Sequence, residues 1–282
     1  MKKIDLEQGT EEWHKFRSNG IGASECAAIF GKCPYNTPYQ LWEKKLGLVE
    51  TEENFAMRRG SKMEPEVRAI VEDMYENEFP PICAIHNKYN FLRASFDGYS
   101  HQLDIILEIK CVKKELHEMA KQGIVPEHYM YQVQQQLLVS GADKAIYASF
   151  NEDLAIVDVE PDIQLHKEII EKVGDFWEKI CLRIEPELSE KDKIFLENEE
   201  LVSLIQEKKL IDQEMKALKE KNEEIGNKLK KYADGKSYYG NGYSVTRFYK
   251  KGSVDYSSIK ELENVNLDLY RKPGAFQWRI NV

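Results

Sequence analysis

The chain has 282 residues, of which 42% are hydrophobic, and a formal net charge of −9. This length suffices for one large domain, or for a domain with an appendage. The acidic balance argues against a protein that coats nucleic acid nonspecifically, although an enzyme with a local basic groove remains compatible with it. No apolar run is long enough for a transmembrane helix, no signal region opens the chain, and the five cysteines have no C-x-x-C spacing. We therefore expect a cytoplasmic protein with free thiols and without a zinc site.

Residues near the N-terminus predict two short helices. The first spans residues 11–17 and ends before Asn19-Gly20. The second begins with Ser24 as its cap and is closed by Gly31. An exposed helix start that carries a hydroxyl is an anion site because free N–H groups point at it, and Arg17 lies just upstream. The alternative is an ordinary serine cap beside a surface arginine.

A long helix is predicted from residue 55 to residue 75, with a break or a new start near Pro65. Glu64 follows three cations and lies away from the polar side of the later turns, so it could face a site. The alternative is a solvated carboxylate. The three cations are Arg58, Arg59 and Lys62.

The centre of the chain combines two carboxylates and a lysine. Residues 91–96 predict a strand that ends near Asp97, and residues 105–109 predict a buried strand that carries Glu108 and leads to Lys110. Glu108 and Lys110 share one face, about 6–7 Å apart, because side chains alternate along a strand. A turn at residues 98–102 would return Asp97 to Glu108. Hard divalent cations favour such oxygen ligands, and the lysine can handle a water. The alternative is a surface hairpin with a salt bridge.

Downstream of this centre, residues 127–140 predict a strong helix with several glutamines beside its apolar face. Gln132 could reach a phosphate or a water, and the alternative is a solvated polar face. Two strands, at residues 145–150 and 155–159, and an amphipathic helix at residues 162–182 follow.

The composition changes near residue 185, which predicts one domain over residues 1–185 and a second region over 186–282. Residues 199–232 are rich in Lys and Glu, with apolar residues at heptad spacing but an imperfect companion position. They indicate either a long helical arm or a short antiparallel pair, and coiled-coil dimerisation stays open. Residues 238–243 predict a hairpin. The basic and aromatic residues 247–251 could contact DNA or belong to a small solvent-facing sheet.

Several blocks in order resemble one family. They are residues 13–17 with 21–25, residues 60–65, Asp97 with Glu108-Ile109-Lys110, and residues 129–134. Over about residues 9 to 180 they resemble the PD-(D/E)xK nucleases, specifically the lambda exonuclease and YqaJ-type phage recombination exonucleases. The resemblance implies an α/β fold with a restriction-endonuclease-like core, in which helices flank a central mixed sheet. The C-terminal helix and hairpin would form an appendage.

The resemblance also implies a metal centre. Asp97 and Glu108 would bind Mg²⁺, or Mn²⁺, with the Ile109 carbonyl as a third ligand and two ions in each active site. Glu64 would orient metal-bound water or support the second ion. Lys110 would position or deprotonate the attacking water.

Further roles follow from the same resemblance. Gln132 would hold the lysine or the water, and Tyr129 would line the site. Arg17 and Ser24 would bind the 5′-terminal phosphate of the shortened strand. Asp104 is not expected to be a ligand, because no block of the family pattern places a carboxylate there.

The implied activity is a Mg²⁺-dependent 5′-to-3′ exonuclease that acts on double-stranded DNA ends. It would leave 3′ overhangs for a single-strand annealing recombinase of the RecT or Red-beta type, in a bacterial host and encoded by a phage or prophage. A sequence- or structure-specific endonuclease and a non-catalytic DNA-end-binding protein are the alternatives. Relatives of the lambda type form rings, so a homo-oligomer, a ring-shaped trimer, is implied, with cations needed only along its channel. Candidates for that channel are Arg58, Arg59, Lys62, Lys113 and Lys114.

Overall fold

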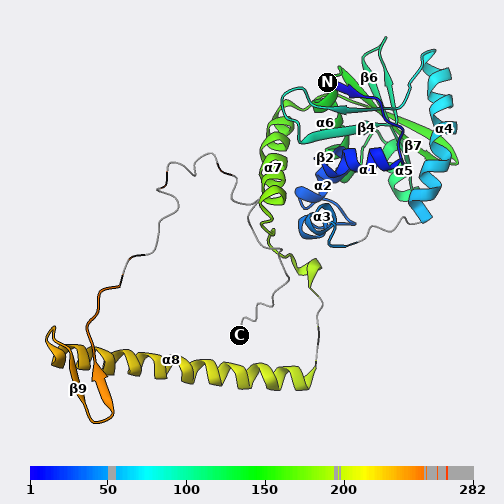
Figure 1. Ribbon diagram of the computed structural model, residues 1–282. Helices are drawn as coiled ribbons and strands as arrows, with labels where there is room; N and C mark the ends of the chain where they lie inside the picture. Colours follow the sequence, from blue (N-terminus) through cyan, green and yellow to red (C-terminus); the bar gives the residue numbers. More distant parts are fainter. Residues whose placement is uncertain are drawn as a thin grey trace. The chain divides into compact units, whose positions relative to one another are not determined.

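The computed structural model describes residues 1–49, 55–193 and 198–250, together with residues 196, 252, 259 and 265 (Figure 1). The chain divides into two compact units, Met1–Ile194 and Phe195–Val282. The boundary between residues 185 and 186, as a division between domains, stays a prediction. In the part of the chain that the structure describes, no helix is both long and apolar enough to span a membrane.

The first unit contains two four-stranded sheets of mixed direction. In the order β1-β3-β4-β2, the first sheet pairs β2 with β4 in parallel and the other strands antiparallel. In the order β5-β6-β7-β8, the second sheet pairs β6 with β7 in parallel and the rest antiparallel. The strands are β1 Lys2–Ile4, β2 Ile21–Gly22, β3 Ile82–Ile85, β4 Leu92–Phe96, β5 Gly98–Ser100, β6 Ile105–Cys111, β7 Lys144–Asn151 and β8 Asp153–Val159.

Helices pack on both sheets, which confirms the predicted α/β class. Helix α4 packs against β6 and helix α6 packs against β4, while α5 covers β7 and β8. Figure 1 shows α4 and α7 at opposite sides of this unit. The helices are α1 Glu11–Ser18, α2 Cys26–Ile29, α3 Pro38–Lys45, α4 Phe55–Tyr75, α5 Lys114–Lys121, α6 Glu127–Ser140 and α7 Ile163–Leu182, with short 3-10 turns η1 Ala23–Glu25 and η2 Glu190–Asp192.

Strand β6 separates two apolar clusters by its alternation. Leu107 and Ile109 pack with Val67 and Val71 of α4 in one cluster. The residues between them point to the opposite face, which α6 covers. Glu108 therefore lies on the α6 side of the sheet.

Helix α4 runs through Pro65 without interruption, so the predicted break is wrong. Proline removes one helical hydrogen bond and crowds the preceding turn, at a cost of about 3 kcal/mol. Val67 and Val71 are fully buried just downstream. Their burial against the sheet supplies the tertiary stabilisation that keeps the helix continuous.

The predicted turn at residues 98–102 is also wrong, because Gly98–Ser100 forms strand β5 and pairs with Ile105–Leu107 of β6. Glycine is required at its start, since a Cβ on Gly98 would lie 2.7 Å from the Cβ of Phe79. The chain turns only after Ser100. As a result β4 and β6 belong to different sheets, and it is the hairpin of β5 and β6 that returns Asp97 to Glu108.

The second unit contains α8 Glu199–Ala233 and a two-stranded antiparallel ribbon of β9 Tyr238–Gly240 and β10 Tyr243–Val245. Helix α8 is a single uninterrupted helix, so the antiparallel helix pair is ruled out. The hairpin is confirmed, although its second strand ends at Val245. Oligomerisation, partner binding and DNA contact by this unit stay predictions.

Candidate active site

Asp97 and Glu108 converge although their strands lie in separate sheets. Asp97 follows the last residue of β4, and its Oδ2 accepts the backbone N–H of Ile109 at 2.7 Å. That hydrogen bond fixes the end of β4 against the middle of β6. Burial and the nearby Glu108 charge raise the pKa of Asp97 well above its ordinary value. The convergence that the sequence predicted is present, and the antiparallel pairing of β5 with β6 returns Asp97 to Glu108.

Glu108 is the most buried of these acids, with 1% of its surface exposed. Its Oε1 accepts hydrogen bonds from Gln132 and Lys110, and its Oε2 accepts one from Gln136. The two glutamines stand one helical turn apart on α6, so they approach the carboxylate from the same side. Gln132 was expected to hold the lysine or a water, but its partner here is Glu108. Gln136 was not predicted at all.

Lys110 pairs with Glu108 on the same face of β6, as strand alternation requires. Burial alone would lower its pKa, but the Glu108 and Asp97 charges outweigh burial and raise it. Lys110 therefore keeps its proton in this arrangement, which suits a residue that positions water better than one that removes its proton. Its Nζ lies 5.4 Å from the ring centroid of Tyr129, which places Tyr129 at the site.

Glu64 lies near this centre but is turned toward Arg68. The two side chains form an ion pair across one turn of α4, and Arg68 Nε also donates to the Asp97 carbonyl at 2.7 Å. Burial, and secondarily the Glu108 charge, raise the pKa of Glu64 against the opposing effect of Arg68. Arg68 was not predicted, although its spacing of four residues from Glu64 is the pattern of a helical ion pair.

The donor set fits a hard divalent cation. Two carboxylates with a backbone carbonyl offer oxygen ligands. The raised pKa of Asp97 reflects burial first and then the neighbouring Glu108 charge, and a cation would relieve that crowding of charge. Within the described ranges, no three His, Cys, Asp or Glu side chains are close enough together to bind one ion. An ion here would therefore use Asp97 and Glu108 with the Ile109 carbonyl or water. Glu64 would have to break its ion pair with Arg68 to bind a second ion.

Arg17 and Ser24, the predicted phosphate ligands, lie together. Arg17 Nη2 donates to Ser24 Oγ at 3.0 Å and stands 3.4 Å from Glu25 Oε1, while its guanidinium lies over the Trp13 ring. Ser24 does not cap a helix, so that prediction is wrong: it lies inside the turn η1, and α2 begins only at Cys26. Gly22 holds the N-cap position of η1 instead, and the Glu25 carboxylate accepts its N–H at 2.7 Å.

A buried ion pair between Lys45 and Glu25 stabilises the region around Arg17 and Ser24. Lys45, 5% exposed, pairs with Glu25 Oε2 at 2.7 Å and donates to the carbonyls of Arg17 and Gly20, both at 2.8 Å. Burial would raise the pKa of Glu25, but the Lys45 and Arg17 charges outweigh it and lower it. Lys45 thus ties α3 to the end of α1 and to the chain leading into β2. Nothing in its local sequence distinguished it from a solvated lysine.

The glutamines of α6 are not a solvated polar face, because each one is buried and bridges to another element. Gln135 donates to the carbonyls of Ile21 and Arg93, and Gln134 donates to the carbonyl of Glu160. Strands β2, β4 and β6 are therefore tied to one helix by side-chain amides. Buried amides that are paired in this way specify one helix position on the sheets.

A Ser–His–Asp array lies beside this centre but serves the fold. His117 of α5 contacts Ser149 Oγ at 2.9 Å and Asp153 Oδ1 at 2.8 Å. Ser149 stands opposite Lys110 in the strand register and is fully buried, so no substrate can reach its hydroxyl. The array holds α5 on strands β7 and β8.

Comparison with known proteins identifies the class first. Two structures of the exonuclease LHK-Exo match with a TM-score of 0.55, each over 62% of this chain and 94% of theirs. One is the alkaline exonuclease from Laribacter hongkongensis, 25% identical, and the other is LHK-Exo in complex with dAMP, 26% identical. The fold is that of the lambda-exonuclease-like nucleases.

The sequence comparisons give a similarity to one family. Residues 12–143 match the YqaJ-like viral recombinase domain. The uncharacterized protein YqaJ of Bacillus subtilis (strain 168) is 31% identical over 179 residues, which is 61% of this chain. The matched part spans only 56% of the length of that relative. The resemblance drawn from the sequence is thus confirmed, and every predicted site residue lies inside the matched segment.

Proposed function

We propose that this protein is a Mg²⁺-dependent 5′-to-3′ exonuclease that resects double-stranded DNA ends to 3′ overhangs. The observation that carries the proposal is the meeting of Asp97, Glu108 and Lys110 at one point, inside a domain that matches recombination nucleases. The likeness to LHK-Exo, an alkaline exonuclease, favours DNA as the substrate.

The chemistry of the centre follows from its residues. Asp97 and Glu108 hold their carboxylates at fixed positions through the Ile109 N–H and the two glutamines. A bound Mg²⁺ would supply charge neutralisation at the phosphate and a more acidic water. Lys110, held protonated between the acids, orients a water by donating to it and stabilises negative charge that develops on the phosphate.

Arg17 and Ser24 supply the anion contact expected of a 5′-phosphate site. Trp13, which lies under the Arg17 guanidinium, donates from Nε1 to Ser95 Oγ at 2.9 Å. Ser95 is in β4, the strand that ends at Asp97. One strand therefore connects the proposed phosphate contact with Asp97, a proposed metal ligand. We propose that this connection sets which bond is cut relative to the end of the strand.

The remaining parts of the proposal concern DNA approach and partners. Burial raises the pKa of the Cys111 thiol, and the Arg59 charge opposes this effect. Arg59 therefore lies near the end of β6, which Lys113 follows closely in the chain. These cations would line the DNA path of an acidic protein. A ring-shaped homo-oligomer and an annealing recombinase in a bacterial cytoplasm complete the hypothesis, with α8 as the candidate contact.

The test is digestion of a linear duplex labelled at either end. The proposal expects Mg²⁺-dependent loss of nucleotides from 5′ ends only, and faster cleavage when the 5′-phosphate is present. Arg17→Ala should remove that phosphate preference while Mg²⁺-dependent cleavage persists.

A covalently closed circular duplex is the control for an endonuclease and should remain intact. Release of label from 3′ ends, or cutting of the closed circle, would contradict the proposed direction and mode of cleavage. If the linear DNA stayed undigested, the remaining alternative would be a non-catalytic DNA-end-binding protein.

A further inference from the structure

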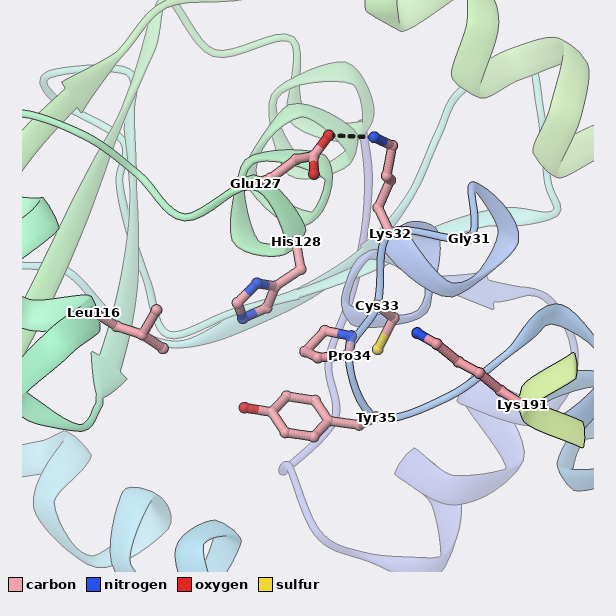
Figure 2. A pocket seen from close by; sticks show the side chains of 9 residues that line it. All are labelled: Gly31, Lys32, Cys33, Pro34, Tyr35, Leu116, Glu127, His128 and Lys191. Atoms are coloured by element: carbon pink, nitrogen blue, oxygen red, sulfur yellow. Dashed lines mark ion pairs between the residues drawn. The ribbon is translucent and has the colours of Figure 1, made fainter. Parts of the chain in front are cut away.

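A cavity of about 530 Å³ lies beside the predicted catalytic centre (Figure 2). It is formed by the segment 31–35, Leu116 of α5, the start of α6 and Lys191 of η2. None of these residues has a role in the hydrolysis derived above. Figure 2 shows the rings of Tyr35 and His128 side by side, with Leu116 and Lys191 on opposite sides of them.

The cavity offers an aromatic surface. Tyr35 is 69% exposed, which is unusual for a large side chain of this unit. Its ring meets that of His128 edge to face, with centroids 6.1 Å apart and planes at 86°. This geometry leaves much of the Tyr35 ring in contact with solvent. Exposed rings of this kind are stacking platforms for nucleobases.

The cavity also offers polar groups that have no partner. His128 Nε2 is buried and has no hydrogen-bond partner within the described residues. Lys191 forms no ion pair with any described residue, whereas Lys32 is paired with Glu127 at 2.7 Å. The Lys191 side chain is exposed, and the segment that carries it is anchored because the neighbouring Asp192 accepts hydrogen bonds from Thr37 and Ser189. Among the described residues, a lysine without an ion pair and a histidine with an unsatisfied ring nitrogen therefore line the same cavity.

The cavity adjoins the chemistry. The ring centroids of His128 and Tyr129 are 4.0 Å apart, and Lys110 Nζ lies 5.4 Å from the centroid of Tyr129. A ligand bound against the His128 ring is thus separated from Lys110 by the ring of Tyr129. A ligand suited to this position has an aromatic base for Tyr35, a polar edge for His128 and a negative charge for Lys191.

We propose that this cavity binds one deoxynucleotide, with its base stacked on Tyr35 and its phosphate at Lys191. The inference rests on the proposed function, since it makes the cavity the subsite for the nucleotide next to the cleaved bond. The same chemistry is present in a nucleotide within the entering DNA strand and in a released mononucleotide.

The test is equilibrium binding by the full chain in EDTA, which prevents cleavage. One arm uses duplexes with 2-aminopurine at the first, second or third position from the 5′ end. The other arm uses free deoxyadenosine monophosphate. The variants are Tyr35→Ala, with Tyr35→Phe as the matched variant that keeps the ring, and Lys191→Ala. Met74→Ala, which truncates another large exposed side chain of the same unit, is the control.

The expected result is quenched 2-aminopurine fluorescence at one position, lost in Tyr35→Ala and kept in Tyr35→Phe. Tyr35→Ala should weaken binding about tenfold, the size expected for one base stack. Lys191→Ala should reduce the dependence of binding on salt by about one ion. Binding of the free nucleotide, lost in the same variants, would assign the cavity to the product, and its absence would assign it to the strand.

Equal quenching and affinity in all the variants would overturn the inference. A failure of the proposed function is a separate result. It would appear as absent Mg²⁺-dependent digestion by the unaltered protein, whatever the binding measurements show.

Discussion

The amide pair that holds Glu108 allows a quantitative prediction. In Gln136→Leu, Glu108 Oε2 loses the amide donor described above, and the Ser95 carbonyl loses a donor at 3.1 Å. A hydrogen bond to a charged group contributes about 1.5–3 kcal/mol and a neutral one about 1 kcal/mol. The substitution also removes Gln136 Oε1, which is buried and has no partner in the described part of the chain. Removing this unpaired buried atom stabilises the fold by about 1–2 kcal/mol.

The net expectation is a loss of about 1–3 kcal/mol in the free energy of unfolding. Denaturant titration of the first unit, followed by the fluorescence of Trp13, Trp42 and Trp177, measures this loss. Since Glu108 is a predicted metal ligand, a residue that orients it should matter for the ion as well. We expect Mg²⁺ affinity or activity to fall about 10- to 100-fold.

Gln122→Leu is the control, because Gln122 is an exposed glutamine of the same unit. It should change neither quantity. If Gln136→Leu left the unfolding free energy, the Mg²⁺ dependence and the cleavage rate unchanged, Gln136 would not position Glu108. If stability fell while metal affinity stayed constant, the amide would serve the fold alone.

Three further predictions concern stability. Lys45→Met should lower the free energy of unfolding by about 3–5 kcal/mol, because it leaves the buried Glu25 charge without its lysine partner. Adding Glu25→Gln should restore part of that loss in a double-mutant cycle. Because the folded-state pKa of Asp97 is raised, its charge destabilises the fold above that pKa, and the penalty fades as pH falls through it. Asp97→Asn should therefore raise Tm at mildly alkaline pH, with a difference that shrinks on acidification; an unchanged Tm would contradict this. Gly98→Ala should cost about 1–3 kcal/mol in chemical denaturation because its Cβ meets Phe79, and a neutral effect would argue against that contact.

Periodicity was sufficient to predict the elements that carry the site. The predicted helix at residues 127–140 coincides with α6, and the alternation of β6 places Glu108 and Lys110 on one face. Both signals are local, since they depend only on which neighbours along the chain share a face. The order of blocks was sufficient for the family resemblance, because that order can be seen without knowing which strands pair.

The partners of the site residues were not predictable in the same way. Arg68, Lys45 and Gln136 act on groups brought to them by other elements, and a single sequence records no such distances. Two of these had a weak signal in retrospect, since Gln136 and Arg68 each stand four residues from a predicted site residue on the same helix. The assignment of Ser24 as a cap failed for a related reason. Its neighbour Glu25 is held by Lys45, from a helix farther along the chain.

The most direct test of the central claim is Mg²⁺-dependent digestion of a 5′-labelled linear duplex by the unaltered protein and by Lys110→Ala. The account predicts cleavage by the unaltered protein that stops with EDTA and resumes when Mg²⁺ is restored. It predicts that Lys110→Ala keeps its fold and its binding of DNA ends but loses cleavage. Normal cleavage by Lys110→Ala in Mg²⁺ would contradict the assignment of Asp97, Glu108 and Lys110 as the catalytic centre.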